Sequence, residues 1–504
     1  MTSSLKKFFE YGAFFCLSAI ICMSLSQSPI YQYYRIDTSI YQYIGKMITD
    51  GYIPYRDVWD HKGPLVYLWH ALGYKIYPMH GIYTLEVIWL SFSLILAYKM
   101  AQNYIKKIYA AFIVVLLFLT TPTSDTIGNT ETLALFPLML ITYTTQKYIA
   151  NNAITKKDSF LIGFMVSALI LIKPLYLVIP GIFCLYICID LIKKAKYKEL
   201  RKFVLAAGIG FILPLSAVLY WLYVNDALKD FYDDYVVFNL LYTVEHHERG
   251  KGTILKTFLF FIRKPAILLA LISTITILVK YKEHKPVEKR LINLFLITFT
   301  LTFISLIIPR NRYVHYLVIL YPIILFFLIF MFKLLKSKVL RITLLEIGIF
   351  IFSFHMYDDI TSTYKKFLSS DQECRKIADI VKKNLGEKET FVSLIDDYAA
   401  LYLYTDHYSA SRYPHISNVD QLLHQQVKKE FEKIKPHIIV GEIKKEVSII
   451  SKNPLQIKAE SKIAYSDLFN PDDYKIIHKD KYPASEIVIF MLKDENSAEG
   501  YNNE

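Results

Sequence analysis

Long apolar stretches separated by short basic segments constrain this chain more than any other feature of its sequence. A helix that crosses the hydrocarbon core of a membrane needs about 20 mostly apolar residues, within a range of about 17–25. We count about eleven candidates of this kind by length and composition, near residues 11–29, 85–102, 109–121, 131–146, 159–173, 175–192, 203–224, 264–280, 291–308, 313–332 and 342–357. The pattern predicts a mainly α-helical, polytopic membrane protein.

The composition excludes several other classes of protein. Of the 504 residues, 54% are hydrophobic and only 20% are charged, which argues against a soluble enzyme. The net charge is +13, but the Lys and Arg residues lie between apolar stretches and form no single basic domain, so we expect no nucleic-acid partner. The five cysteines include no C-x-x-C pair, so neither a disulfide framework nor a zinc site is indicated.

The positions of the basic residues predict the orientation in the membrane. If the N-terminus is cytoplasmic, the cytoplasmic segments all carry Lys or Arg, as the positive-inside rule requires: they are 1–10, 103–108, 147–158, 193–202, 281–290 and 333–341. Residues 30–84, 225–263 and 358–504 then face outward across the plasma membrane, and so do short loops between other spans, such as "TPTSDTIGNT" before Glu131. The first apolar stretch, which follows Lys6 and Lys7, also fits a cleaved signal peptide, and cleavage would leave the remaining topology unchanged.

The tail after residue 357 differs abruptly in composition from the part before it. Candidate helices and strands alternate along it, which predicts a small extracytoplasmic α/β domain at 358–504, separate from a transmembrane domain at 1–357. The tail has no Gly-rich phosphate loop, so we interpret it as a structural or acceptor-recognition domain. The candidate helices are 371–385 and 420–434, and the candidate strands are 390–395, 437–442, 474–480 and 486–494.

Carboxylates cluster in the segments predicted to face outward at the membrane surface. The stretch "YRDVWDHKGPLVY" at 55–67 carries several ionisable residues between two apolar stretches. A carboxylate held partly in a low dielectric can serve as a general base, and the alternative is that each carboxylate caps a helix or pairs with a cation. The candidates are Asp37, Asp57, Asp60 and Glu131.

Cations also lie on the outward side, where the positive-inside rule does not explain them. Lys and Arg at this surface indicate an anionic ligand at the level of the lipid headgroups, such as a phosphate attached to a lipid. The alternative is snorkelling to ordinary anionic lipids. Together with a carboxylate base, such cations predict transfer of a group from a lipid phosphate to an acceptor hydroxyl. The cations are Lys62, Lys173, Arg310 and Arg312.

Residues 35–68 resemble the first-loop signature of the bacterial GT-C glycosyltransferases, a superfamily that includes the protein O-mannosyltransferases, the aminoarabinose transferases of lipid A and the Rgt-type galacturonosyltransferases. The signature is an Asp after the first helix, followed by G-x-x-PY-x-D-x-x-D-x-KGPL. The matching residues are Asp37, Gly51, Pro54, Tyr55, Asp57, Asp60, Lys62, Gly63, Pro64 and Leu65. Weaker similarity extends over most of residues 10–340, in "NTETLALFPLML" at Glu131, "LIKPLYLVIP" at Lys173 and "RNRYVHYLVILYP" at Arg312, His315 and Tyr316.

The resemblance implies a GT-C fold and an inverting hexosyl- or pentosyltransferase that uses a polyprenyl-phosphate sugar. It implies that Asp37 is the catalytic base or orients the acceptor, and that Lys62, Lys173 and Arg312 bind the donor phosphate. It implies that Asp60 and Glu131 are further catalytic residues in supporting roles and that His315 supports the donor-phosphate site, and the loop signature adds Tyr55, Asp57 and His61. No cofactor is required on this interpretation, and a divalent cation is left open.

The acceptor stays open among a lipid, a glycan and a protein. The aminoarabinose transferases carry E-K-P-P-L where this chain has "DHKGPL", so the acceptor need not be lipid A. One alternative is a transporter or flippase of lipid-linked sugars, which would place more charges in mid-span and show internal repeats. Another is a polysaccharide polymerase or ligase, which topology does not exclude and against which the first-loop signature argues.

Overall fold

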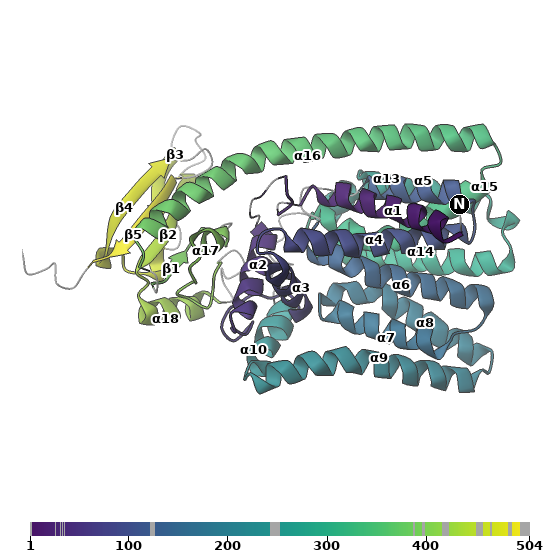
Figure 1. Ribbon diagram of the computed structural model, residues 1–504, viewed down its shortest axis with the longest axis horizontal. Coiled ribbons are helices and arrows are strands. Elements are labelled where there is room, and N and C mark those ends of the chain that lie inside the picture. Colours follow the sequence, from purple (N-terminus) through teal and green to yellow (C-terminus); the bar gives the residue numbers. More distant parts are fainter. Residues whose placement is uncertain are drawn as a thin grey trace, which may run out of the picture. The chain divides into compact units, whose positions relative to one another are not determined.

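The computed structural model describes residues 3–25, 27–30, 32, 34, 36–120, 127–241, 253–386, 389–395, 399–415, 423–449, 457–463, 466–481 and 486–493. Most of the described chain is helical, and a small sheet lies near its C-terminal end (Figure 1). The chain divides into two compact units. Unit 1 comprises Met1–Gln32, Lys62–Leu228 and Asn239–Lys365, and unit 2 comprises Tyr33–His61, Lys229–Phe238 and Lys366–Glu504.

Unit 1 is a helical bundle, and each predicted apolar stretch overlaps one of its helices. Its elements are α1 (Ser3–Cys22), α3 (Pro64–Ile76), α4 (Gly81–Gln102), α5 (Lys107–Phe118), α6 (Thr130–Asn151), α7 (Lys156–Ile170), η1 (Pro174–Leu177), α8 (Val178–Lys193), α9 (Tyr197–Val224), α12 (Ile254–Ile262), α13 (Pro265–Val279), η3 (Tyr281–Glu283), α14 (Pro286–Ile307), η4 (Val314–Leu320), α15 (Tyr321–Leu334) and the first part of α16 (Lys338–Lys383).

Five helical stretches of the described chain are long and apolar enough to cross a membrane, and a sixth candidate is α12 with α13, which are bent by 80° at their junction. The five are Gly81–Gln102, Pro174–Lys193, Tyr197–Val224, Pro286–Ile307 and Val314–Leu334. These helices fit a polytopic membrane protein, but the predicted count of about eleven spans is not confirmed. Two of the predicted spans fall in helices that are short, since α5 and α7 are only 12 and 15 residues long.

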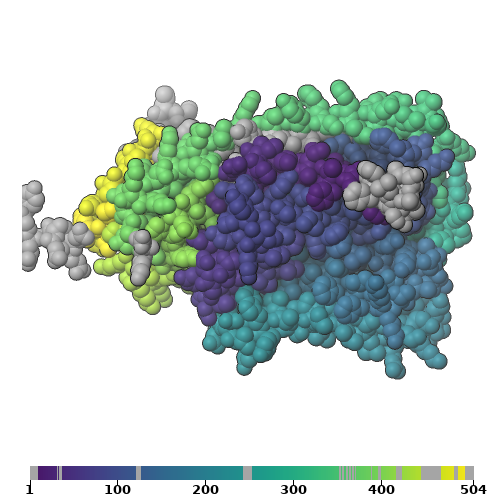
Figure 2. Space-filling model, in the orientation of Figure 1, coloured from purple at the N-terminus to yellow at the C-terminus, as the bar shows by residue number. Residues whose placement is uncertain are grey.

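The core of the bundle lies around α15, and α9 is peripheral. In the most apolar window of η4 and α15, 89% of residues are buried inside the protein, against 11% for α9. Figures 1 and 2 show α9 along one edge of the bundle, beside α7. The two backbones approach closely at Gly163, where an added Cβ would lie 1.8 Å from the carbonyl oxygen of Ala207. Small residues at helix contacts are typical of membrane bundles, in which van der Waals packing drives association.

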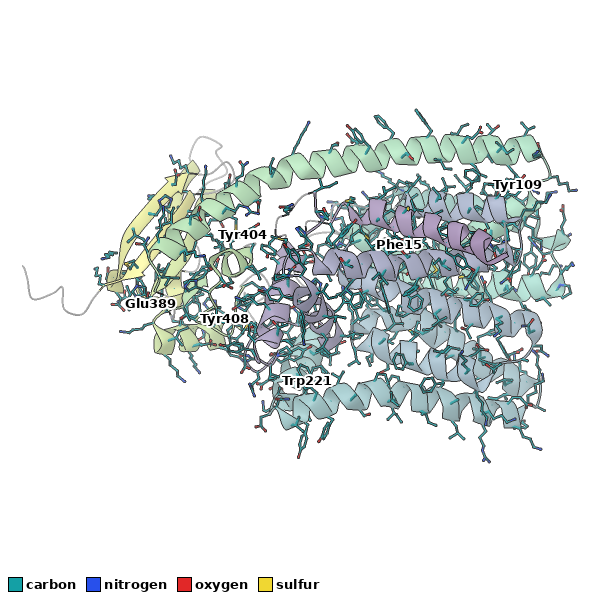
Figure 3. All side chains as sticks on the ribbon, in the orientation of Figure 1. Phe15, Tyr109, Trp221, Glu389, Tyr404 and Tyr408 are labelled. Carbon is teal, nitrogen blue, oxygen red and sulfur yellow. The ribbon has the colours of Figure 1, made fainter. Side chains whose placement is uncertain are left out.

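Unit 2 gathers three segments that are far apart in the sequence. Its helical elements are α2 (Ile36–Thr49), α10 (Leu228–Phe231), the π-helical turn η2 (Tyr232–Val237), the end of α16, α17 (Ala400–Thr405), α18 (His424–Ile434), η5 (Ser466–Leu468) and η6 (Pro471–Asp473). Contacts between the tail and the first segment include the rings of Tyr404 and Tyr34, and Lys46 over Tyr408; Tyr404 and Tyr408 are labelled in Figure 3. The segments 30–84, 225–263 and 358–504, which we predict to share one side of the membrane, each contribute to this unit, although 242–252 lie outside the described residues.

The tail contains a five-stranded sheet of β1 (Phe391–Ser393), β2 (Ile438–Ile449), β3 (Ile457–Ile463), β4 (Tyr474–Lys481) and β5 (Glu486–Leu492). The order is β1-β2-β5-β4, with β3 also paired to β2. Among the strand pairs of the described residues, β1–β2 is parallel and β2–β3, β2–β5 and β4–β5 are antiparallel. The middle of β2 pairs with β5 through Ile439 and Phe490, and both side chains are buried.

Most predicted elements of the tail are found, with three differences. The sequence analysis missed β3 and α17, and part of the predicted helix 420–434 lies outside the described residues. The predicted span 342–357 and helix 371–385 belong to one continuous helix, α16. No Pro or Gly lies between residues 358 and 370 to interrupt it. The division of the chain at residue 357 stays a prediction.

Candidate functional site

The Lys62-Gly63-Pro64 motif docks on the C-terminal end of α7. The backbone N–H of Gly63 donates to the carbonyl of Ile172 over 3.0 Å, and that of Leu65 donates to the carbonyl of Leu171 over 3.1 Å. A Cβ on Gly63 would lie 2.1 Å from the Leu171 carbonyl oxygen, so only glycine fits. Pro64 then begins α3, where its missing N–H costs nothing.

This docking brings the backbones of two predicted lysines to the same place in the bundle. Lys62 precedes Gly63, and Lys173 follows Ile172, so both lysines leave the chain beside the same pair of backbone contacts. The backbone of Lys62 is fixed further by the Tyr67 hydroxyl, which accepts from its N–H over 3.0 Å and donates to its carbonyl over 3.2 Å. Two cations that the sequence separates by more than a hundred positions are therefore anchored at one junction of the bundle.

Glu131 lies in the first turn of α6 and is buried, with 1% of its surface exposed. The hydroxyl of Tyr176 donates to its Oε1 over 2.6 Å, and Thr130 Oγ1 lies 2.6 Å from the same hydroxyl. The ammonium of Lys173 lies 3.6 Å from Oε1. A buried carboxylate is tolerated when it is paired and hydrogen-bonded, and both conditions are met here.

The segment around η4 supplies the other partners of Lys173. Its ammonium donates to the Tyr316 hydroxyl over 3.1 Å and lies 4.2 Å from the centre of that ring. His315 lies beside Tyr316, with ring centroids 4.9 Å apart, and is close enough to Glu131 to interact with it electrostatically. Arg312 precedes η4 on the same segment and is exposed. The structure therefore brings Glu131, Lys173 and His315 together.

The structure adds Tyr176 and Thr130, which the sequence analysis did not single out. The Tyr176 hydroxyl donates to the Glu131 carboxylate, and the Thr130 hydroxyl lies beside that of Tyr176. The signal available in the sequence was the spacing: Tyr176 stands three residues after Lys173 in "KPLY", and Thr130 immediately precedes Glu131.

The site residues predicted in the first loop before Lys62 belong to unit 2, whereas Arg310 lies in unit 1, two positions before Arg312. Asp37 lies in the first turn of α2 and is exposed. Asp57 folds its own loop: its carboxylate accepts from the N–H of Ile53 over 2.7 Å and from two nitrogens of Arg56. Burial alone would raise the pKa of Asp57, but the hydrogen bonds from Arg56 and Ile53 outweigh it and hold the pKa below its usual value. These contacts favour the pairing interpretation of Asp57 over that of a base.

Asp60 is buried in an aromatic cluster that contains two histidines. Its Oδ1 lies 3.3 Å from Nδ1 of His61 and 3.8 Å from Nε2 of His415, and all three side chains are buried. The Trp59 ring packs against both histidines. Tyr55, also buried, has a φ of 69°, a left-handed conformation that is uncommon for a residue other than glycine.

Within the described residues, no group of three or more His, Cys, Asp or Glu side chains is arranged to hold a metal ion.

The fold is similar to three solved structures of membrane transferases with the GT-C fold. ArnT from Cupriavidus metallidurans in the apo state matches with a TM-score of 0.58 and 12% identity over 86% of this chain and 93% of that chain. The Archaeoglobus fulgidus oligosaccharyltransferase in complex with Zn and sulfate matches with a TM-score of 0.51 and 10% identity, over 94% of this chain and 79% of that chain. The oligosaccharyltransferase AglB of the same organism, in complex with an inhibitory peptide and a dolichol-phosphate, matches with a TM-score of 0.54 and 9% identity, over 95% of this chain and 80% of that chain. The chain thus has the GT-C fold, as the first-loop signature predicted.

A narrower family is defined by the sequence of the bundle. The family model of the competence-induced protein Ccs4 N-terminal domain matches residues 3–342, and this chain belongs to that family. No curated protein sequence matches the chain significantly.

Proposed function

We propose that the protein transfers a sugar from a polyprenyl-phosphate donor to an acceptor hydroxyl on the extracytoplasmic face of the membrane. The observation that carries this proposal is that, in a GT-C fold, Gly63 after Lys62 docks on the residues just before Lys173, whose ammonium contacts Glu131 and Tyr316. The dolichol-phosphate bound in the AglB structure supports a lipid phosphate as the leaving group. Cell-envelope glycan or glycolipid modification is the process that such a reaction serves.

The chemistry needs one base and a cationic site. The base removes the proton of the acceptor hydroxyl while the hydroxyl oxygen attacks the anomeric carbon of the sugar. The bond between that carbon and the phosphate oxygen breaks, and polyprenyl phosphate leaves with the electron pair. Attack from the face opposite the leaving group inverts the anomeric centre. Cations fixed in advance near the phosphate stabilise the charge that develops there.

The surroundings of each residue support its proposed role. Lys173 is held by Glu131 and Tyr316 with 21% of its side chain exposed, so its ammonium is fixed yet accessible to a phosphate. Lys62 and the exposed Arg312 complete the cationic site. Glu131 is buried and acts on the donor site through Lys173. Asp37 is exposed at the start of α2 and is the proposed base.

The test compares wild-type protein with Asp37→Asn in nanodiscs, using a panel of polyprenyl-phosphate sugars and a crude membrane extract as the source of acceptor. Wild type should release polyprenyl phosphate, and Asp37→Asn should lose release while it still binds the donor. Asp379→Asn, which changes another exposed helical aspartate, is the matched control and should retain release. If wild type binds donors and never releases polyprenyl phosphate, the proposal fails, and a flipping assay would address the transporter alternative.

A further inference from the structure

A short segment of the tail, residues 409–415, runs along the first-loop signature within unit 2. Arg412 is the centre of this contact. Its Nε donates to the carbonyl of Tyr55 over 2.7 Å, and its own carbonyl accepts from the N–H of Trp59 over 2.7 Å. The loop that precedes Lys62 is therefore bonded at two positions to one residue that stands 357 positions later.

The guanidinium of Arg412 also binds the third segment of unit 2. One of its terminal nitrogens forms an ion pair with Asp234 in η2, and the two side chains are 23% and 8% exposed. Phe231 and Phe238, which flank η2, pack on the rings of Tyr55 and Trp59. Arg412 thus joins all three segments of unit 2 through charge-assisted hydrogen bonds, which are about twice as strong as neutral ones.

The tail holds Arg412 in place through α18. Glu430 accepts from the backbone N–H of Arg412 over 2.7 Å and from the Ser411 hydroxyl over 2.9 Å. A second contact follows three residues later, where His415 meets Asp60. The segment is therefore a fixed support for the loop.

The loop needs a support of this kind because part of its backbone is strained. Tyr55 adopts a left-handed conformation, which is unfavourable for a residue other than glycine and persists only where the surroundings enforce it. The N–H of Tyr55 donates to the Val58 carbonyl over 2.8 Å, and its carbonyl accepts from Arg412. Without Arg412, the Tyr55 carbonyl would lose its charged partner and the turn could relax.

We propose that Arg412 is a positioning residue: the C-terminal tail holds the first-loop signature, and through it the backbone that leads to Lys62, in the conformation that the transfer reaction requires. The consequence for catalysis rests on the proposed function, whereas the positioning of the loop does not.

The first experiment is hydrogen exchange of the full-length protein in nanodiscs, read at peptides that cover residues 53–61. Arg412→Gln should accelerate exchange there by about tenfold, and Arg412→Lys should do so less, because lysine keeps the charge but lacks the second nitrogen. Peptides from β2 and β5 should not change. Arg375→Gln is the matched control, because it removes another arginine of the tail that is ion-paired, in this case to Asp371.

Unchanged exchange at 53–61 in Arg412→Gln would overturn the proposal. Equal acceleration in β2 and β5 would also overturn it, because Arg412 would then serve the fold of the tail. The second measurement is turnover of the donor: Arg412→Gln should lower kcat with little change in KM, and Arg412→Lys should recover part of the loss. If wild type shows no turnover, the proposed function fails, while the exchange experiment still decides on the positioning of the loop.

Discussion

At the scale of single residues, the ion pair of Glu131 and Lys173 is asymmetric. The carboxylate is buried and the ammonium is partly exposed. Removing the ammonium therefore leaves a buried carboxylate without its charged partner. Lys173→Met should destabilise the bundle by about 1–3 kcal/mol, because it leaves a charged carboxylate unpaired in a low dielectric. The Tm of Lys173→Met, measured by intrinsic fluorescence, should fall.

The double variant Lys173→Met with Glu131→Gln separates stability from catalysis. It should recover most of the lost Tm, since no unpaired charge remains, but it should not recover donor turnover. Equal losses of Tm in the single and double variants would show that Lys173 stabilises the bundle by packing alone.

Asp57 gives a prediction about pH. Its pKa is lower in the folded protein than in the unfolded chain, because the hydrogen bonds from Arg56 and Ile53 outweigh burial. Such a carboxylate stabilises the fold at pH values above its pKa in the unfolded chain, which is about 3.9. This stabilisation is lost as the pH falls through its lower pKa in the folded protein. Wild type should therefore have a higher Tm than Asp57→Asn at pH 6–7, and the difference should shrink as the pH approaches about 3. A difference that is constant across this range would contradict the assignment.

At the scale of elements, Gly63 decides how closely α3 and α7 meet. Gly63→Ala places a methyl group where the Leu171 carbonyl already lies, so the two backbones must separate. We expect a destabilisation of about 1–3 kcal/mol, together with weaker donor binding, because Lys62 and Lys173 move apart. Gly181→Ala in α8 is the control: nothing lies within 4 Å of the added atom, and alanine favours a helix, so its Tm should be unchanged or slightly higher. If Gly63→Ala were as stable and active as this control, the contact of Gly63 with Leu171 would have no role in the proposed donor site.

The contact at Gly63 also shows what the sequence alone could not predict. The helices of the bundle were predictable because long apolar stretches carry their own signal, and strands β1, β2, β4 and β5 because short β-rich stretches do. The docking of Gly63 on Leu171 and Ile172 uses backbone groups on both sides, so it leaves no trace in residue types apart from the glycine itself. The continuity of α16 was missed because its apolar and charged halves look like different elements. Arg412 was missed because nothing near position 412 indicates partners at 55, 59 and 234.

At the scale of the whole molecule, the grouping of unit 2 bears on topology. Its three segments are separated in the sequence by the helices of unit 1, and a compact unit requires all three to lie on one side of the membrane. This agrees with the distribution of Lys and Arg, which places the same segments outside. The direction itself, with a cytoplasmic N-terminus, depends on the charges alone.

Cysteine labelling in intact cells tests that direction. In a background without the five native cysteines, Lys475→Cys in β4 should react with a membrane-impermeant maleimide, and Lys198→Cys in α9 should react only after the cells are permeabilised. Both lysines are exposed, so accessibility within the protein does not separate the two sites. The reverse pattern would place unit 2 in the cytoplasm, where a donor presented on the outer face is out of reach, and the proposed reaction would fail with it. Labelling of both sites in intact cells would mean that one of the helices between them does not cross the membrane, because residues 198 and 475 would then lie on the same side.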